Sequence, residues 1–259
     1  MMGSLYIAAT GMRAQQQNLD VTANNLANVN TTGFKRMRSE FQDLHYQIVR
    51  SPGTPNGGDQ IPTGIQVGMG VREAGTSRLF SQGDVQQTDN PLDLDIEGDG
   101  FFQVTQSDGT LAYTRSGSLQ LNSQGQLVTV DGQLISPGIT VPAGASKINI
   151  TSDGTVSATV GNAQSVLGQI QLARFINPAG LESVGNNLYI ATPASGDPQI
   201  GAPGSTNMGT LAQGAVEMSN VKVVDEMVNM ITAMRSYEAI SKTIQTSDEM
   251  LGLANNVKR

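Results

Sequence analysis

Hydrophobic residues recur at seven-residue intervals near both ends of the chain, whereas the middle contains shorter apolar runs separated by turn-forming residues. A repeat of seven keeps its members on one stripe of an α-helix, and over three or more heptads it is typical of a coiled-coil seam. The first series is Leu5, Met12, Leu19 and Leu26, and the second is Val223, Met230, Tyr237, Ile244 and Leu251. We therefore predict two terminal helices that pair with each other as a coiled coil.

The predicted N-terminal helix has a nearly uncharged polar surface. From Met1 to Phe34 only Arg13 and Asp20 are charged, and most other polar residues are Gln and Asn. Amide groups both donate and accept hydrogen bonds, so they suit contact with surrounding protein. We expect neighbouring subunits to enclose this helix and to complete its ordering. The alternative interpretation is two ordinary amphipathic helices packed on one globular core.

The chain changes character after the first helix. Residues 35–75 are predicted to form an extended connecting segment, because the stretch 51–70 is rich in Gly and Pro and disfavours regular helix. We expect that stretch to project from the rest. The expected division is a helical terminal domain from residues 1–34 and 216–259, the connecting segment, and a β-rich domain from residues 76–215.

Short alternating runs and turn dipeptides dominate the middle of the chain, a pattern typical of antiparallel β structure. Hairpin turns are indicated at Asp108-Gly109, Asp131-Gly132, Asp153-Gly154 and, more weakly, Gln124-Gly125. Strands are predicted at Phe101–Thr105, Leu111–Thr114, Ser118–Leu121, Leu127–Val130, Lys147–Ile150, Val156–Val160, Gln169–Phe175 and Asn187–Ala191. The predicted fold class is mixed α and β, with an antiparallel all-β domain inserted between two pairing helices.

Composition and charge narrow the functional classes. With 259 residues, 38% of them hydrophobic, the chain can bury a core, and its net charge of −7 with a single basic cluster at Lys35, Arg36 and Arg38 argues against nucleic acid. Cysteine is absent, so no disulfide or thiolate chemistry is available. No apolar run approaches the length of a membrane span, and the first residues lack the pattern of a secretory signal peptide. We expect no membrane insertion, and any export must use a route without a cleaved signal.

Catalytic and metal-binding patterns are weak. His45 is the only histidine, and no Gly-x-Ser-x-Gly elbow accompanies it. The alternating acids of Asp93 to Asp99 resemble half of a calcium loop, but the bidentate Glu that would end such a loop is replaced by Val104. The residues between these acids read equally well as the buried face of a strand. We expect no catalytic residue, no cofactor and no metal, and a secreted β-domain protein that binds glycan remains a distant alternative.

Six segments spread over nearly the whole chain carry a family resemblance. They are residues 23–35 (ANNLANVNTTGFK), 98–104 (GDGFFQV), 113–117 (YTRSG), 185–189 (GNNLY), 213–221 (QGAVEMSNV) and 226–238 (EMVNMITAMRSYE). The chain resembles the bacterial flagellar rod and hook proteins. Its length, its Gly/Pro-rich insert after Tyr46 and its segment Val71 to Gln87 are most similar to the distal rod proteins, with proximal rod or hook protein as the alternatives.

The resemblance implies a structural, non-enzymatic protein of the flagellar basal body. Such a chain polymerises into a straight periplasm-spanning rod that transmits torque, with the terminal helices forming an inner tube and the β domain lying outside. Expected partners are further copies of the chain, proximal rod proteins, hook protein, and the periplasmic and outer-membrane rings. Export through the flagellar type III apparatus is also implied. The assembly interface is predicted to be the two heptad series.

Overall fold

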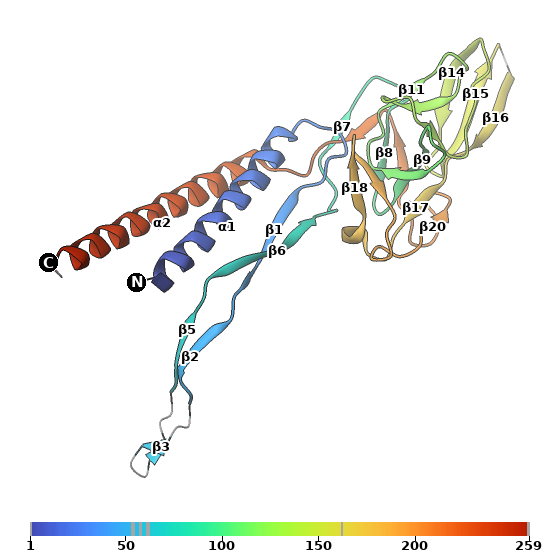
Figure 1. Ribbon diagram of the computed structural model, residues 1–259. Helices are drawn as coiled ribbons and strands as arrows, with labels where there is room; N and C mark the ends of the chain where they lie inside the picture. Colours follow the sequence, from blue (N-terminus) through green and yellow to red (C-terminus); the bar gives the residue numbers. More distant parts are fainter. Residues whose placement is uncertain (1, 53–54, 57–58, 61–62, 162, 258–259) are drawn as a thin grey trace. The chain divides into compact units, whose positions relative to one another are not determined.

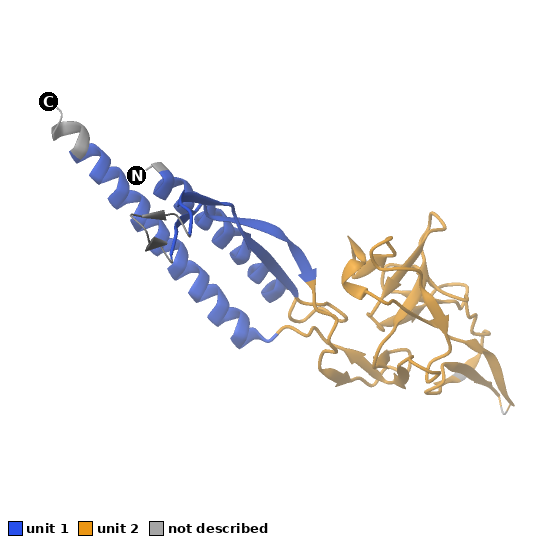
Figure 2. Ribbon diagram, turned by 90° about the horizontal axis from the view of Figure 1, so that it is seen from below, with its two compact units in different colours: residues 1–27, 37–77, 222–259 blue, residues 28–36, 78–221 orange. Residues whose placement is uncertain are grey.

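The computed structural model describes residues 2–52, 55–56, 59–60, 63–161 and 163–257 of the chain (Figure 1). The chain forms two compact units (Figure 2). Unit 1 consists of Met1–Ala27, Met37–Ser77 and Lys222–Arg259, and unit 2 consists of Asn28–Arg36 and Arg78–Val221. The chain therefore passes between the units four times.

Two long helices form one part of unit 1. Helix α1 spans Met2–Ala27 and helix α2 spans Val223–Val257, and they lie side by side in antiparallel directions (Figures 1 and 2). Asn25 near the end of α1 donates a hydrogen bond to Glu226 near the start of α2, 3.2 Å away. The predicted pair of terminal helices is present. Helix α2 begins after residue 216, the expected start of the C-terminal helical segment, because Ala215–Glu217 form a strand in unit 2.

The connecting segment is a ribbon of paired strands. Strand β1 (Met37–Asp43) pairs with β6 (Val71–Arg78), and β2 (Tyr46–Arg50) pairs antiparallel with β5 (Ile65–Gly68). The short strands β3 (Pro55–Asn56) and β4 (Asp59–Gln60) pair further along. The Gly/Pro-rich stretch 51–70, which we expected to project, lies partly outside the described residues. Strand β2, just before this stretch, and β5 within it are solvent-exposed except at Gly68.

Apolar side chains are exposed on both faces of the β2–β5 ribbon. Tyr46 and Ile48 alternate with Gln47 and Val49 along β2. Tyr46 is 54% exposed, Ile48 is 58% exposed and Val49 is 63% exposed. Val67, which pairs with Gln47, is 44% exposed. Successive side chains of a strand point to opposite faces, so both faces of this ribbon present exposed apolar side chains.

Unit 2 is built from antiparallel strands. Its largest sheet has the order β11-β12-β13-β9-β10-β19-β18, and β17 pairs with both β9 and β20. The strands are β9 (Phe101–Thr105), β10 (Leu111–Thr114), β11 (Leu119–Leu121), β12 (Leu127–Thr129), β13 (Leu134–Ile135), β17 (Leu172–Arg174), β18 (Glu182–Gly185), β19 (Leu188–Ile190) and β20 (Gln199–Gly201). A short 3₁₀ helix spans Pro178–Gly180.

Smaller sheets complete unit 2. One has three strands in the order β14 (Ala145–Ile150), β15 (Thr155–Val160) and β16 (Ala163–Gln169). Two pairs join distant parts of the sequence: β8 (Leu94–Glu97) with β21 (Thr210–Gln213), and β7 (Val85–Gln87) with β22 (Ala215–Glu217). The end of unit 2 is therefore paired with its beginning.

Two apolar clusters stabilise unit 2. The larger contains Leu94, Phe102, Leu119 and Leu172, all fully buried, together with other aliphatic residues. The smaller is aromatic: the rings of Tyr113 and Phe175 meet edge-on with centroids 4.8 Å apart. Fully burying a large apolar side chain contributes about 1.5–3 kcal/mol, so these clusters dominate the stability of the unit.

The turn predictions are confirmed. The dipeptides join β9 to β10, β12 to β13, β14 to β15 and β11 to β12, and their glycines have φ between 76° and 83°. Glycine takes this left-handed conformation without steric cost. Each predicted strand overlaps an observed one. The predicted strand Gln169–Phe175 is wrong in its extent, because β16 ends at Gln169, the backbone of Ile170 binds Gly154, and β17 begins at Leu172.

Candidate assembly surface and buried charge cluster

The predicted heptad series lie partly exposed on unit 1. Leu5, Met12, Leu19 and Leu26 of α1 are half-buried, as are Met230, Ile244 and Leu251 of α2. Val223 and Tyr237 are 40% and 36% exposed. Their role as an interface between copies remains a prediction.

The most buried residues of the two helices belong to other rows. On α1 these are Ala14, Val21, Thr22 and Asn25, and on α2 they are Glu226, Ala233 and Ser247. Glu226, Ala233 and Ser247 also follow heptad spacing. Sequence reasoning missed this row because it followed large apolar residues, whereas small and polar residues allow the helices to approach. A search for seven-residue spacing among small residues could have found it.

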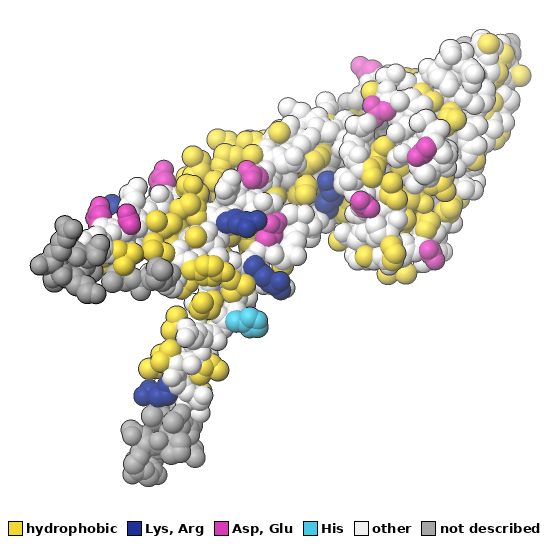
Figure 3. Space-filling view, viewed as in Figure 1, with side chains coloured by type: hydrophobic (Ala, Val, Ile, Leu, Met, Phe, Trp, Pro, Cys, Tyr) yellow, Lys and Arg dark blue, Asp and Glu magenta, His cyan; other side chains and the backbone are white. Residues whose placement is uncertain are grey.

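A ridge of exposed apolar side chains follows the first turns of α2. We call Val224, Met227, Val228, Ile231 and Met234 the α2 ridge; each is 50–72% exposed. Their spacing of three and four places Val224, Met227, Ile231 and Met234 on one side of the helix. Figure 3 shows hydrophobic side chains along the helical part of unit 1. A contiguous apolar surface of this kind marks a site of protein contact.

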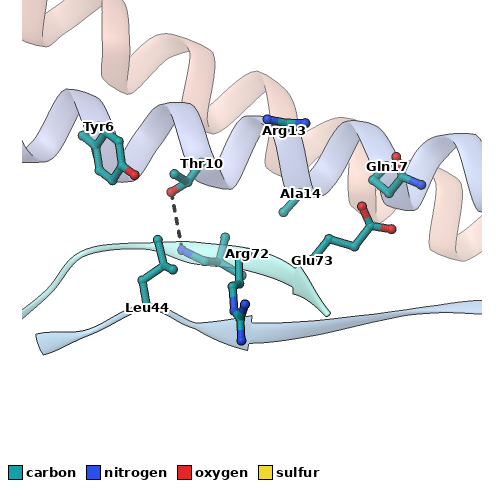
Figure 4. Close-up of a pocket in the computed structure, with 9 residues that line it drawn as sticks. Tyr6, Thr10, Arg13, Ala14, Gln17, Leu44, Arg72 and Glu73 are labelled. Atoms are coloured by element: carbon teal, nitrogen blue, oxygen red, sulfur yellow. Dashed lines mark hydrogen bonds between the residues drawn. The ribbon is translucent and has the colours of Figure 1, made fainter. Parts of the chain in front are cut away.

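A hollow of about 440 Å³ lies between α1 and the β1–β6 ribbon within unit 1 (Figure 4). Tyr6, Thr10 and Ala14 line it from the helix, and Leu44 and Arg72 line it from the ribbon. The Thr10 hydroxyl accepts a hydrogen bond from the Val71 amide at 3.4 Å and donates one to the Ile7 carbonyl at 2.8 Å. The bond from Val71 links the ribbon to the helix.

A cluster of buried charges lies in unit 2. The Glu217 side chain is fully buried and accepts hydrogen bonds from Lys35 Nζ at 2.6 Å and Arg115 Nε at 2.7 Å. The Gly83 amide also donates to Glu217 at 2.8 Å. Arg115 donates further bonds to the carbonyls of Ile96, Gly98 and Gly100. Buried ions need such complete pairing, because each pays a desolvation cost of several kcal/mol.

The cluster sets the ionisation of its carboxylates. Burial favours the neutral form of Glu217, but the charges of Arg115 and Lys35 outweigh it and hold the pKa of Glu217 below its usual value. Asp95, which is 1% exposed, has the opposite behaviour: burial and then the Glu217 charge raise the pKa of Asp95. In the part of the chain that the structure describes, neither carboxylate oxygen of Asp95 has a hydrogen-bond partner.

The acidic run from Asp93 to Asp99 does not form a calcium loop. Asp93 accepts hydrogen bonds from the side chains of Thr88 and Asn90, Asp95 is buried in β8, and the Asp99 side chain is 78% exposed. Among the described residues, no group of three or more His, Asp or Glu side chains could hold a metal ion. The interpretation of this run as a strand with a buried face is confirmed.

Two sequence candidates remain, His45 and a membrane span. His45 is exposed, at the junction of β1 and β2. In the described part of the chain, no helix is both long and apolar enough to cross a membrane.

Three regions match known protein families. Residues 5–35 match the flagella basal body rod protein family, residues 95–158 match the D1 domain of flagellar hook protein FlgE/F/G, and residues 212–257 match the C-terminal region of flagellar basal body rod FlgEFG proteins. The flagellar basal-body rod protein FlgG of Borreliella burgdorferi is 51% identical, over the full length of both chains. The chain belongs to the FlgG family of flagellar basal-body rod proteins.

Other relatives are consistent with this family. FlgG of Agrobacterium fabrum is 46% identical over 98% of both chains. A second type of relative, the flagellar hook-basal body complex protein FlhP of Bacillus subtilis, is 35% identical over the full length of both chains. Helix α2 and Glu217 both lie within the C-terminal match, residues 212–257.

Proposed function

We propose that this chain is a structural subunit of the flagellar basal body that polymerises into the straight distal rod and transmits torque from the motor to the hook. The observation that carries the proposal is full-length similarity to FlgG proteins combined with the exposed α2 ridge. A chain that acted alone would leave this apolar surface in water. A polymer buries it against further copies.

The interface between copies is proposed to use both the heptad series and the α2 ridge. The heptad series contributes half-buried side chains, and the α2 ridge contributes apolar side chains that are at least half exposed. The nearly uncharged α1 surface suits enclosure, because few charges would be desolvated. The two helices then form a coiled-coil inner tube.

The other parts have separate proposed roles. Residues 35–75 connect neighbouring copies through the ribbon, whose apolar side chains are exposed on both faces. Residues 76–215 form the outer domain, which faces the periplasmic and outer-membrane rings. The rod contacts proximal rod proteins at one end and hook protein at the other. Subunits reach the rod through the flagellar type III apparatus, without a cleaved signal, and act without enzymatic activity.

Electron cryomicroscopy of basal bodies from a source strain lacking the gene tests this function. A short rod without outer rings or hook is expected, and the full chain supplied in trans should restore it. A complete rod that lacks only the hook would transfer the chain to the hook proteins. Intact basal bodies would contradict the proposal.

Labelling tests the interface. The chain has no cysteine, so Ile231→Cys supplies a unique thiol on the ridge. It should react with maleimide in the monomer and be protected in isolated rods. Ser123→Cys, in an exposed turn of unit 2, is a control for rod integrity and reagent access. Equal labelling of Ile231→Cys in monomer and rod would exclude the ridge from the interface.

A further inference from the structure

The four chain passages between the units follow Ala27, Arg36, Ser77 and Val221. Any force between unit 1 and unit 2 that travels along the chain must pass through these four peptide links. A single unsupported strand can rotate about its φ and ψ bonds, so the stiffness of such a connection depends on what holds the strands on each side.

In unit 2, the side chains of Glu217 and Asn220 hold all three segments that contain these passages. Glu217 binds Lys35, just before one passage, and Gly83, shortly after another. Lys35 Nζ also donates to the carbonyl of Ser81 at 2.8 Å. The backbone of Glu217 accepts from the Gly33 amide at 2.8 Å.

The side-chain amide of Asn220 joins the same three segments as Glu217. Its Oδ1 accepts from the Arg36 amide at 2.7 Å, and its Nδ2 donates to the carbonyls of Leu79 at 2.8 Å and Ser81 at 3.0 Å. We call Lys35, Glu217 and Asn220, with their partners, the unit 2 tie. It joins the segments 31–36, 79–83 and 217–220.

Unit 1 has its own tie on the other side of the same passages. Asn25 Oδ1 accepts from the Met37 amide at 2.9 Å, and Asn25 Nδ2 donates to the Met37 carbonyl at 2.8 Å and to Glu226 Oε2 at 3.2 Å. Asn25 and Glu226 are each 1% exposed. This unit 1 tie therefore joins the end of α1, the start of β1 and the first turn of α2. At the remaining passage, which follows Ser77, the Ser77 hydroxyl donates a hydrogen bond to Glu40 at 3.0 Å.

We propose that the two ties act as a joint that makes the four passages carry force together, and that Asn25 and Asn220 are its positioning residues. The inference rests on the proposed function, because it gives these residues a role in torque transmission. Each tie joins chain segments that are more than 100 residues apart in sequence, such as those of Arg36 and Asn220 in unit 2 and of Asn25 and Glu226 in unit 1. Side-chain amides suit this task because each one donates and accepts at once.

Hydrogen exchange tests the tie in the purified full chain. Asn220→Ala should speed exchange of the Arg36 amide about tenfold, because that amide loses its acceptor and opens by local fluctuation. Asn122→Ala is the matched control: Asn122 is half-buried in unit 2, binds the amides of Gln124 and Gln126 and the side chain of Gln126, and lies in a hairpin turn. It should leave the Arg36 amide unchanged. Unchanged exchange in Asn220→Ala would overturn the tie.

Rotation under load tests the role. In the deletion strain, cells carrying Asn220→Ala or Asn25→Ala should build rods of normal length and swim like the parent in dilute medium. As viscosity rises, their speed should fall at least about twofold below that of the Asn122→Ala strain, with broken rods, since weakly held strands yield first.

The outcomes separate the two proposals. Failure of the parent chain to restore rods counts against the function itself. Restored rods with the same viscosity response in all variants overturn the joint. If Asn220→Ala does not fold, Asn220→Asp keeps the acceptor for Arg36 but turns an oxygen towards the carbonyls of Leu79 and Ser81, so it should still lose speed under load. An Asp variant that equals the parent at every viscosity then overturns the joint.

Discussion

Gly11 of α1 faces Ile240 of α2 so closely that a Cβ built on Gly11 would lie 3.4 Å from Ile240 Cδ1. Gly11 therefore has ordinary contact distance to its neighbour and no room for a large side chain. Glycine inside a helix costs about 1 kcal/mol relative to alanine, so the close approach of the helices is obtained against local propensity.

Gly11→Leu should push the helices apart and destabilise unit 1 by about 1–3 kcal/mol through overpacking. Gly252→Leu is the control, because nothing lies within 4 Å of the Cβ position of Gly252 on α2. That control should be neutral or stabilising. Urea unfolding followed by helical circular dichroism measures both, and equal behaviour would show that Gly11 does not set the helix spacing.

Glu217→Gln should destabilise unit 2 by about 3–5 kcal/mol, since it removes the carboxylate that is hydrogen-bonded to the buried Lys35 and Arg115. The chain has no tryptophan, so fluorescence of the buried Tyr113 and Tyr189 can follow urea unfolding of this unit. The exposed Glu182→Gln is the control.

The pH dependence of the parent follows from the lowered pKa of Glu217. A carboxyl group with a depressed folded-state pKa adds stability above its unfolded pKa, near 4.3, and that stability is lost as pH falls through the folded value. The parent should therefore lose stability in acid more steeply than Glu217→Gln. Parallel curves would mean that the carboxylate does not contribute through its charge.

Asp95→Asn should stabilise unit 2 at neutral pH by about 1–3 kcal/mol, because a buried carboxylate without a hydrogen-bond partner is removed. The pKa of Asp95 is raised, so the folded state binds this proton more tightly and the parent recovers stability as pH falls. The advantage of Asp95→Asn should shrink in acid. Asp99→Asn, at an exposed position, should show no such gain, and a destabilised Asp95→Asn would reveal an essential charge.

Ile231→Asp and Leu19→Asp should both abolish rod assembly while unit 2 remains folded, because each places an unpaired charge in an interface between copies. Asn229→Asp adds the same charge to α2 at an exposed position outside the ridge and should still assemble. Sedimentation of isolated rods and motility in soft agar measure the effect. Normal motility of the Leu19 variant would remove the heptad series from the interface.

Deletion of residues 51–70 should make the polymer bend like a hook, because the stretch is proposed to bridge neighbouring copies and stiffen the tube. Replacement by a flexible Gly/Ser segment of equal length separates the loss of contacts from the loss of length. Electron microscopy of the polymers measures curvature. Polymers that remain straight in both variants would count against the bridge.

Local chemistry predicted much of unit 2. Asp-Gly dipeptides fix turns by themselves, because glycine alone enters the left-handed region freely, and so Asp108-Gly109 and Asp153-Gly154 could be placed correctly. The terminal helices could be placed because their apolar spacing is long and regular. The start of the second helix could not, since Ala215–Glu217 pair as a strand with Val85–Gln87, which lie far away in the sequence.

The buried ties were not predictable from one sequence. Lys35 belongs to a basic cluster that looks like a solvated loop, and no local pattern distinguishes it from Arg36 or Arg38. Asn25 and Asn220 are common polar residues whose importance comes only from what the fold brings beside them. The buried positions Ala14 and Ala233 were missed for a related reason: close packing favours small side chains, which hydrophobicity patterns rank low.

The two apolar faces of the β2–β5 ribbon affect how a polymer of this chain would begin. Covering Tyr46 and Ile48 on one face and Val49 and Val67 on the other takes a neighbour on each side. A pair of copies covers only one face of each ribbon, and a third copy is the first to leave one ribbon enclosed. If neighbouring copies do cover both faces, the first small assemblies would be unfavourable, and subunits would remain dispersed until an existing end supplied the missing neighbours.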